Sequence, residues 1–87
     1  MPQVTVILPT WNRAKWLKTS VESVLLQTFQ YFELIVVDYA STDSTGKILE
    51  SYSRKIRTIL LPENLGVSAA RNTAIVQSDS KWIAFLD

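Results

Sequence analysis

Polar and aromatic residues stand directly after short apolar runs of this 87-residue chain. An aromatic ring such as that of Trp11 can stack on a planar base, which contributes about 1–3 kcal/mol per base. The Asp38 carboxylate can accept a hydrogen bond from a base or a ribose hydroxyl, and Arg71 can neutralise a phosphate as a planar fork. Asp87 can approach Mg²⁺ or Mn²⁺, which prefer oxygen ligands. These residue types suit a bound nucleotide, and the segments concerned are 9–13, 38–43, 62–66 and 87.

The elements that must position these residues are strands and helices in alternation. The first two apolar runs are nearly continuous in β-branched and aliphatic residues, which is typical of strands buried on both faces of a parallel sheet. Three segments with helical spacing of apolar residues separate the runs. The expected strands are 4–8, 33–37, 57–61 and 81–86, and the expected helices are 14–27, about 43–54, and 67–77.

This alternation predicts the α/β class, with a three-layer αβα fold around a mostly parallel sheet of about four strands. Ligands bind beyond the carboxyl ends of the strands in such sheets, which is where the polar and aromatic residues stand. Asn12 is expected to cap the first helix, and Asp43 or Ser44 to cap the second. Trp16, inside the first expected helix, is expected to pack and not to bind a ligand, and Trp82 is expected to lie in the core.

The composition excludes several kinds of site. The chain has no cysteine and no histidine, which excludes a disulfide, a Cys-based zinc site, a catalytic cysteine and a histidine general base within it. Its only glycines are Gly46 and Gly66, so the dinucleotide fingerprint G-x-G-x-x-G and a Walker A loop are absent. Nine basic and eight acidic residues leave a net charge of +1, and no nucleic-acid partner is expected.

Taken together, these segments resemble the N-terminal, nucleotide-binding half of a family-2 inverting glycosyltransferase with the GT-A fold. The resemblance is specific because six segments fall in the family's order and span nearly the whole chain. It implies a Rossmann-like sheet with strand order 3-2-1-4 and a single partial domain, residues 1–87, that stops after its fourth strand. The matching segments are 4–13 (VTVILPTWNR), 23–28 (SVLLQT), 32–38 (FELIVVD), 41–45 (STDST), 64–72 (NLGVSAARN) and 83–87 (IAFLD).

The resemblance implies that the chain binds a nucleoside-diphosphate sugar, expected to be a UDP-sugar. Pro9, Thr10 and Trp11 match the segment that wraps the base, and Arg71 matches a basic residue that reaches the nucleotide. Asp87 matches the first Asp of the D-x-D motif, which holds a divalent cation, Mn²⁺ or Mg²⁺. The sugar passes with inversion to an acceptor hydroxyl, expected on a carbohydrate or a lipid-linked compound. The family's second Asp and its catalytic base fall beyond residue 87, so this chain is expected to hold no catalytic residue and to be inactive alone.

One departure from the family pattern concerns the end of the second strand. The family normally continues Asp-Asp-Gly-Ser there, and its second Asp binds the base. This chain has Asp38, Tyr39, Ala40 and Ser41, so a phenol stands where the base-binding carboxylate is expected. Tyr39 could offer a hydroxyl or a stacking ring, the base could differ, or the protein could bind weakly.

Each candidate residue also has a simpler interpretation. Asp38 could cap a turn, and Trp11 could be a surface aromatic residue without a ligand. Arg71 could pair with a carboxylate on its own helix, and Asp87 could have no role in this chain. Asp43, which stands in a Ser-Thr-Asp turn before a helix, is expected to be structural.

Two functions remain open from the sequence: half of a glycosyltransferase, or a non-catalytic α/β module for binding or assembly. A second Asp shortly after Asp87 in the longer protein would favour the enzyme. We expect a cytoplasmic location, with membrane association through regions outside the chain as the alternative. The fourth strand, with Trp82, Ile83 and Phe85, is expected to be an open edge through which the chain self-associates.

Overall fold

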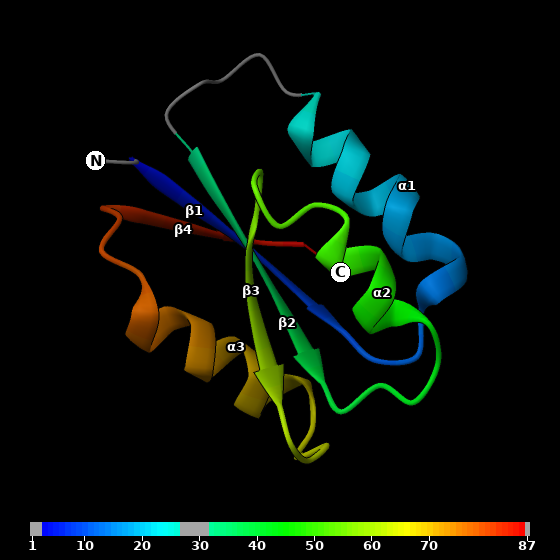
Figure 1. The fold of residues 1–87 in the computed structure, drawn as a ribbon. Helices are drawn as coiled ribbons and strands as arrows, with labels where there is room; N and C mark the ends of the chain where they lie inside the picture. Colours follow the sequence, from blue (N-terminus) through cyan, green and yellow to red (C-terminus); the bar gives the residue numbers. More distant parts are fainter. Residues whose placement is uncertain (1–2, 27–31, 87) are drawn as a thin grey trace.

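The computed structural model describes residues 3–26 and 32–86 of the chain. Strands and helices alternate along these residues as the sequence predicts (Figure 1). The strands are β1 (Val4–Thr10), β2 (Phe32–Tyr39), β3 (Arg57–Leu61) and β4 (Trp82–Phe85), and the helices are α1 (Ala14–Leu25), α2 (Thr45–Glu50) and α3 (Val67–Gln77).

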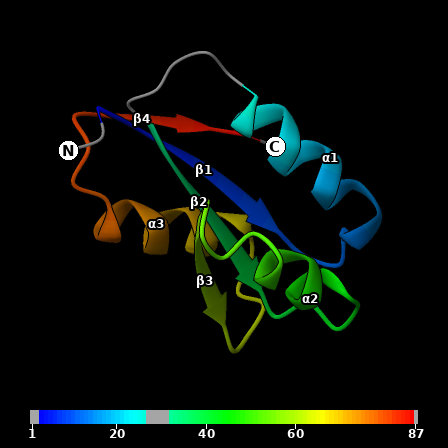
Figure 2. The same cartoon turned by 45° about the horizontal axis from the view of Figure 1, so that its top comes forward.

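The four strands form one parallel sheet in the order β3-β2-β1-β4, which confirms the predicted order. The last residue of β1, Thr10, pairs with Asp38 near the end of β2, so the loops that follow these two strands start side by side. Helices α1 and α2 cover one face of the sheet and α3 covers the other (Figures 1 and 2). The predicted three-layer αβα architecture is therefore confirmed.

Two separate cores lie on the two faces of the sheet. On one face, Leu8 of β1 packs in a cluster that includes Val21 of α1. On the other face, Ile7 of β1 packs with Ala70 and Ala74 of α3, whose small side chains let the helix approach the sheet closely. Successive strand residues point to opposite faces of the sheet. The face on which the core residues of a strand lie therefore also fixes the face to which the side chains of its last residues point.

Helix α2 and strand β4 differ most from the prediction, while β1 and β2 extend by one or two residues beyond their predicted ends. Helix α2 ends at Glu50 and not near residue 54, and the Ser51 hydroxyl donates to the Ile48 carbonyl. Serine side chains that bond to the preceding turn compete with the helical backbone, which accounts for the early end. Trp82 was predicted to lie in the core, and this is wrong: its side chain is 63% exposed, because β4 lies at the edge of the sheet and is exposed along all four residues.

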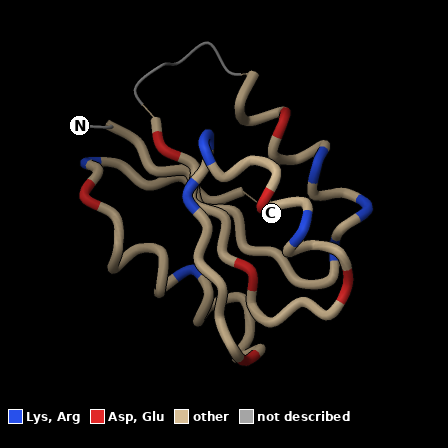
Figure 3. The backbone as a smooth tube through the Cα atoms, viewed as in Figure 1, with Lys and Arg blue, Asp and Glu red and all other residues tan. Residues whose placement is uncertain are grey.

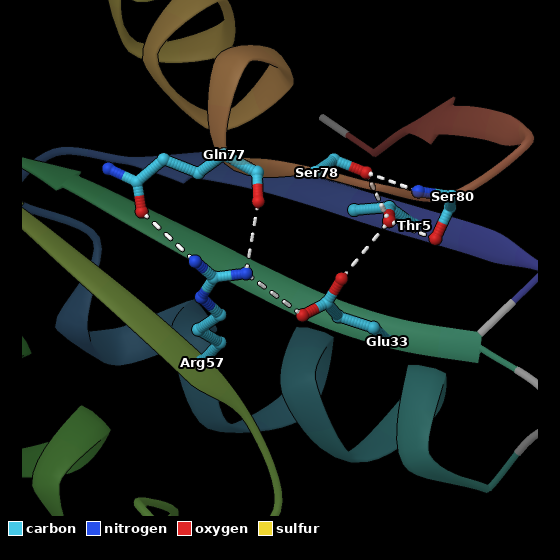
Figure 4. A network of polar contacts seen from close by, with 6 residues as sticks. All are labelled: Thr5, Glu33, Arg57, Gln77, Ser78 and Ser80. Carbon is cyan, nitrogen blue, oxygen red and sulfur yellow. Dashed lines mark hydrogen bonds and ion pairs between the residues drawn. The ribbon is translucent and has the colours of Figure 1, made fainter. Parts of the chain in front are cut away.

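A polar network closes the amino-terminal end of the sheet (Figure 4). Thr5, fully buried in β1, donates to Glu33 of β2 at 3.2 Å, and its Oγ1 lies 2.6 Å from the hydroxyl oxygens of Ser78 and Ser80. Glu33 also forms an ion pair with Arg57 of β3 at 3.2 Å. The network ties three strands to the α3–β4 connection, at the end of the sheet opposite to the predicted binding residues.

Charged residues of both signs are interspersed over the described part of the molecule (Figure 3). This distribution agrees with the near balance of basic and acidic residues in the sequence. Within residues 3–26 and 32–86, no helix has both the length and the apolar character that crossing a membrane requires.

Candidate functional site

A pocket lies at the carboxyl end of β1, where β4 stops short of its neighbour. Strand β4 pairs with β1 only over residues 4–7, so the end of β1 is left open on this side among the described residues. The cavity measures about 390 Å³, within the usual range of small-molecule sites. We name it the β1 pocket, and its lining residues are Leu8, Pro9, Thr10, Trp11, Arg13, Trp16, Leu17, Ser20, Tyr39, Val67 and Arg71.

Three aromatic side chains line the β1 pocket from three different segments. Trp11 follows β1 and is 42% exposed, so part of its surface is available for stacking. Trp16 lies in the first turn of α1 and is 59% exposed, so the prediction that it packs is wrong. The buried face of α1 carries Leu17 and Val21 instead, which turns Trp16 outward. Tyr39 ends β2 and packs partly against the core beneath α3.

The charged residues that line the β1 pocket are both cationic. Arg13 immediately precedes α1 and Arg71 lies in α3, so the two guanidinium groups come from opposite layers of the fold. The Arg71 guanidinium lies 5.4 Å from the centroid of the Phe85 ring, a cation–π contact that holds it near β4. Since no carboxylate lines this pocket among the described residues, its charge favours an anionic ligand.

Thr10 brings a buried hydroxyl to the β1 pocket. Its side chain is 4% exposed, and among the described residues its Oγ1 has no hydrogen-bond partner. Leaving a buried hydroxyl unpaired costs about 1–3 kcal/mol. Because this oxygen is itself buried, a ligand in the pocket would reach it only if the surrounding side chains shifted.

Asp38 lies away from the β1 pocket although the adjacent Tyr39 lines it. Successive strand residues face opposite sides, and Asp38 is buried on the side of α2 with 6% exposure. Its Oδ1 accepts a hydrogen bond from Ser41 N at 3.1 Å, which is the turn-capping role that the sequence left open. It lines a second cavity, the β2 pocket, formed by Asp38, Ala40, Ser41, Asp43, Gly46, Lys47, Glu50, Leu60 and Leu61.

Hydrogen bonds join the loop after β1 to the loop after β2 and thereby place Trp11 and Arg13. Asn12 N donates to Ser41 Oγ at 2.8 Å, and Thr42 N donates to Asn12 Oδ1 at 2.7 Å. Asn12 has a φ of 48°, in the left-handed region that asparagine tolerates well. The prediction that Asn12 caps α1 is wrong, because its side chain bonds to the neighbouring loop and Arg13 occupies the cap position.

Asp43 completes this set of bonds, which we call the loop clasp (Asn12, Ser41, Thr42 and Asp43). Its Oδ2 accepts from Ala14 N, at the start of α1, at 3.2 Å, and its Oδ1 accepts from Thr45 N at 3.0 Å and from the Thr45 hydroxyl. The bond from the Thr45 hydroxyl, followed by that from the Thr45 amide, lowers the pKa of Asp43 below its ordinary value of 3.8. The prediction that Asp43 is structural is confirmed.

Five of the seven residues predicted to bind a nucleotide line the β1 pocket. Asp38 lies in the β2 pocket, and Asp87 lies outside the described residues. Among the described residues, no group of three or more His, Cys, Asp and Glu side chains could hold a metal ion. The residues that the β1 pocket brings together as predicted are Pro9, Thr10, Trp11, Tyr39 and Arg71.

Six lining residues of the β1 pocket were not predicted as site residues, and three of them are charged, aromatic or polar, namely Arg13, Trp16 and Ser20. They recur at spacings of three and four residues, which places them on one face at the start of α1. A polar and aromatic stripe at this spacing, directly after a predicted strand, was the signal that could have identified them.

Comparisons with known proteins identify the family and the fold of the chain. A family model described as Glycosyl transferase family 2 matches residues 5–87. The protein TuaG of Bacillus subtilis (strain 168) is 39% identical over 89 aligned residues, which cover 99% of this chain and 35% of TuaG. The chain therefore spans about a third of the length of this relative.

Two solved structures share the fold. The 1–349 structure of S. aureus TarS in complex with UDP-GlcNAc is 35% identical with a TM-score of 0.91, and the match covers 100% of this chain and 26% of that one. The mannosyltransferase PcManGT from Pyrobaculum calidifontis, in complex with GDP-Man and Mn²⁺, is 30% identical with a TM-score of 0.82. That match covers 88% of this chain and 24% of PcManGT.

Proposed function

Because the chain belongs to glycosyl transferase family 2, we propose that it is the nucleotide-sugar-binding half of a hexosyltransferase-like enzyme. This enzyme transfers a sugar from a nucleoside-diphosphate sugar to an acceptor hydroxyl, with inversion at the anomeric carbon. The observation that carries the proposal is the β1 pocket, which combines stacking rings with two guanidinium groups at the carboxyl end of a parallel sheet.

In this proposal the base lies against Trp11, and the diphosphate lies near Arg13 and Arg71. Guanidinium groups bind phosphate oxygens through charge-assisted hydrogen bonds, often two at a time. The ligand class is supported by TarS, which was solved with UDP-GlcNAc, and by PcManGT, which was solved with GDP-Man. A UDP-sugar is the donor that we propose for this chain.

The chemical step needs groups beyond the described residues. The acceptor oxygen attacks the anomeric carbon opposite the leaving diphosphate, which inverts the carbon, and a carboxylate base takes the acceptor proton. The divalent cation, Mn²⁺ or Mg²⁺, is part of the proposal, with Asp87 as its ligand from this chain. When bound, it supplies positive charge to the diphosphate. A carbohydrate or lipid-linked acceptor and a cytoplasmic location complete the proposal.

Nucleotide titrations of the 87-residue chain test this function. Base stacking is worth about 1–3 kcal/mol, so Trp11→Ala is expected to weaken UDP binding by about 5- to 150-fold in isothermal titration calorimetry. Trp82→Ala is the matched control, because it removes an exposed tryptophan that does not line the β1 pocket. Equal affinities for the wild type and Trp11→Ala would refute the stacking role.

We also propose that the 87 residues alone do not transfer sugar, because they hold no histidine and no proposed catalytic base. Release of sugar from a panel of nucleotide sugars with Mn²⁺ is expected to stay at background. Turnover that disappears on substitution of Asp38 or Asp87 would contradict this prediction. We therefore expect the 87-residue chain to bind a nucleotide without transferring sugar.

The alternative function is a non-catalytic module of the same fold. Two observations favour it: position 39 is a tyrosine, and the Asp38 carboxylate bonds within its own turn. The residues that follow Asp87 in any longer protein that contains this chain discriminate between the two functions. A second Asp there supports the enzyme, and its absence supports the module.

A further inference from the structure

Hydroxyl groups supply most of the uncharged hydrogen-bonding capacity of the β1 pocket. They come from Thr10, Ser20 and Tyr39, and the remaining polar side chains are two indole N–H groups and two guanidinium groups. A hydroxyl both donates and accepts, and it rotates to suit its partner, whereas a carboxylate only accepts. Among the described residues, no carboxylate or carboxamide side chain lines this pocket. Therefore no side chain that lines the pocket requires the ligand to donate a hydrogen bond.

Asp38, whose carboxylate is adjacent in sequence, does not change this character. It lies in the β2 pocket on the opposite side of the strand from Tyr39, and its Oδ1 is occupied by Ser41 N at 3.1 Å. The Oγ1 of Thr10 is itself buried, whereas Ser20 and Tyr39 are half-buried and line the β1 pocket. Their hydroxyls can meet either a donor or an acceptor on a ligand.

The hydroxyl groups of the β1 pocket affect whether the pocket can distinguish uracil from cytosine, two bases of the same size. Uracil and cytosine have closely similar stacking faces, but the ring N3 of uracil donates a hydrogen bond and that of cytosine accepts one. A site with a fixed acceptor rejects the wrong analogue strongly, because buried polar groups are left unpaired. A site with rotating hydroxyls pairs with either base.

Resting on the nucleotide binding proposed above, we propose that the β1 pocket does not discriminate between uridine and cytidine diphosphates. Tyr39 is the position that determines this specificity, because it ends β2 at the pocket wall and presents a phenol in place of a carboxylate. The stacking rings and the two arginines act equally on both nucleotides, since UDP and CDP share their sugar and diphosphate.

The test compares dissociation constants for UDP and CDP by calorimetry, using the 87-residue chain and three variants. The two constants are expected to agree within about threefold for the wild type. Tyr39→Asp installs an acceptor for uracil N3–H, and a hydrogen bond to a charged group is expected to favour UDP over CDP by about tenfold or more. Tyr39→Phe is expected to keep the ratio near that of the wild type, because it adds no fixed acceptor and the Ser20 hydroxyl remains.

Leu60→Asp is the matched control, because it adds the same charge at an exposed residue of the β2 pocket. It is expected to leave the ratio of the two constants unchanged.

A wild-type preference of more than about tenfold for either nucleotide overturns the proposal, and so does an unchanged ratio in folded Tyr39→Asp. If circular dichroism shows that Tyr39→Asp is unfolded, the proposal is tested by the ratio of the UDP and CDP dissociation constants in the wild type and in Tyr39→Phe. Absence of binding by both nucleotides refutes the proposed function itself, an outcome distinct from selective binding of one.

Discussion

Ala40, in the turn after β2, holds a conformation that alanine normally avoids. Its φ is 70°, and a left-handed backbone costs a residue with a Cβ roughly 1–2 kcal/mol. The turn is held because Asp38 accepts from Ser41 N, and Ser41 and Thr42 bond to Asn12 in the loop clasp. Strain of this kind persists where the surrounding bonds impose the conformation.

Ala40→Gly is expected to raise the free energy of unfolding by about 0.5–1 kcal/mol, because glycine adopts positive φ without a Cβ penalty. Ala69→Gly is the matched control, since the same change inside α3 is expected to lower the free energy of unfolding by about 1 kcal/mol. Urea midpoints followed by circular dichroism report both values. Shifts of the same sign in the two variants would show that the turn is not strained.

At the scale of elements, the loop clasp sets the direction in which α1 leaves the sheet. The bonds from Asn12 and Asp43 join two loops that follow neighbouring parallel strands, and the start of α1 carries Arg13 and Trp16. Because these side chains line the β1 pocket, the geometry of the pocket depends on contacts made outside it. The clasp therefore acts by positioning, without contact to a ligand.

The stability provided by Asp43 is expected to depend on pH. Its pKa is lowered in the folded state, so the charged form is favoured by folding, and the contribution is fully present above the ordinary value of 3.8. The contribution is lost as the pH falls below 3.8 towards the lower folded-state pKa. The wild type is therefore expected to exceed Asp43→Asn in melting temperature at about pH 7, and the difference is expected to shrink near pH 3.

Glu63→Gln controls for the change in net charge, because Glu63 is exposed in the loop after β3. It is expected to have a melting temperature close to that of the wild type throughout this range. A difference between the wild type and Asp43→Asn that stays constant with pH would show that the carboxylate charge is not what stabilises the clasp.

At the scale of the whole molecule, β4 is the exposed edge of the sheet. It pairs with β1 alone among the described residues, and Trp82, Ile83 and Phe85 are all exposed. An edge strand with apolar side chains and open backbone groups is a template for pairing with another chain. Self-association through β4 therefore stays a prediction, and Trp82, Ile83 and Phe85 form the surface that it would use.

Light scattering of the 87-residue chain at micromolar concentration is expected to report a mass near twice 9.9 kDa or larger. Ile83→Lys places a charge on the edge and is expected to shift the chain towards the monomer. Leu65→Lys, which charges an exposed residue in the loop before α3, is expected to leave the mass unchanged. A monomeric wild type, or a dimer that is unaffected by Ile83→Lys in a folded protein, would contradict the prediction.

The sequence alone determined the elements, their class and the end of the sheet at which the candidate binding residues stand. The continuous apolar run of β2 and the helical spacing of α1 are local patterns, so they follow from short-range periodicity. The strand order came from the family resemblance, because pairing between distant strands leaves no local pattern. Five of the eleven lining residues of the β1 pocket were predicted, and the lining residues that α1 contributes were not.

Only the tertiary structure decided the roles of particular side chains at that end. Asn12 bonds across to Thr42 because β1 and β2 pair in a register that sets Thr10 beside Asp38. The separation of Asp38 from Tyr39 was implicit in strand alternation, but their two pockets exist only once α1, α2 and α3 are in place. The tertiary structure likewise decided the exposure of Trp82. The next residues in sequence are apolar, as in a core strand, but β4 lies at the edge of the sheet. Burial depends on which elements pack over a residue, and that is a property of the assembled layers.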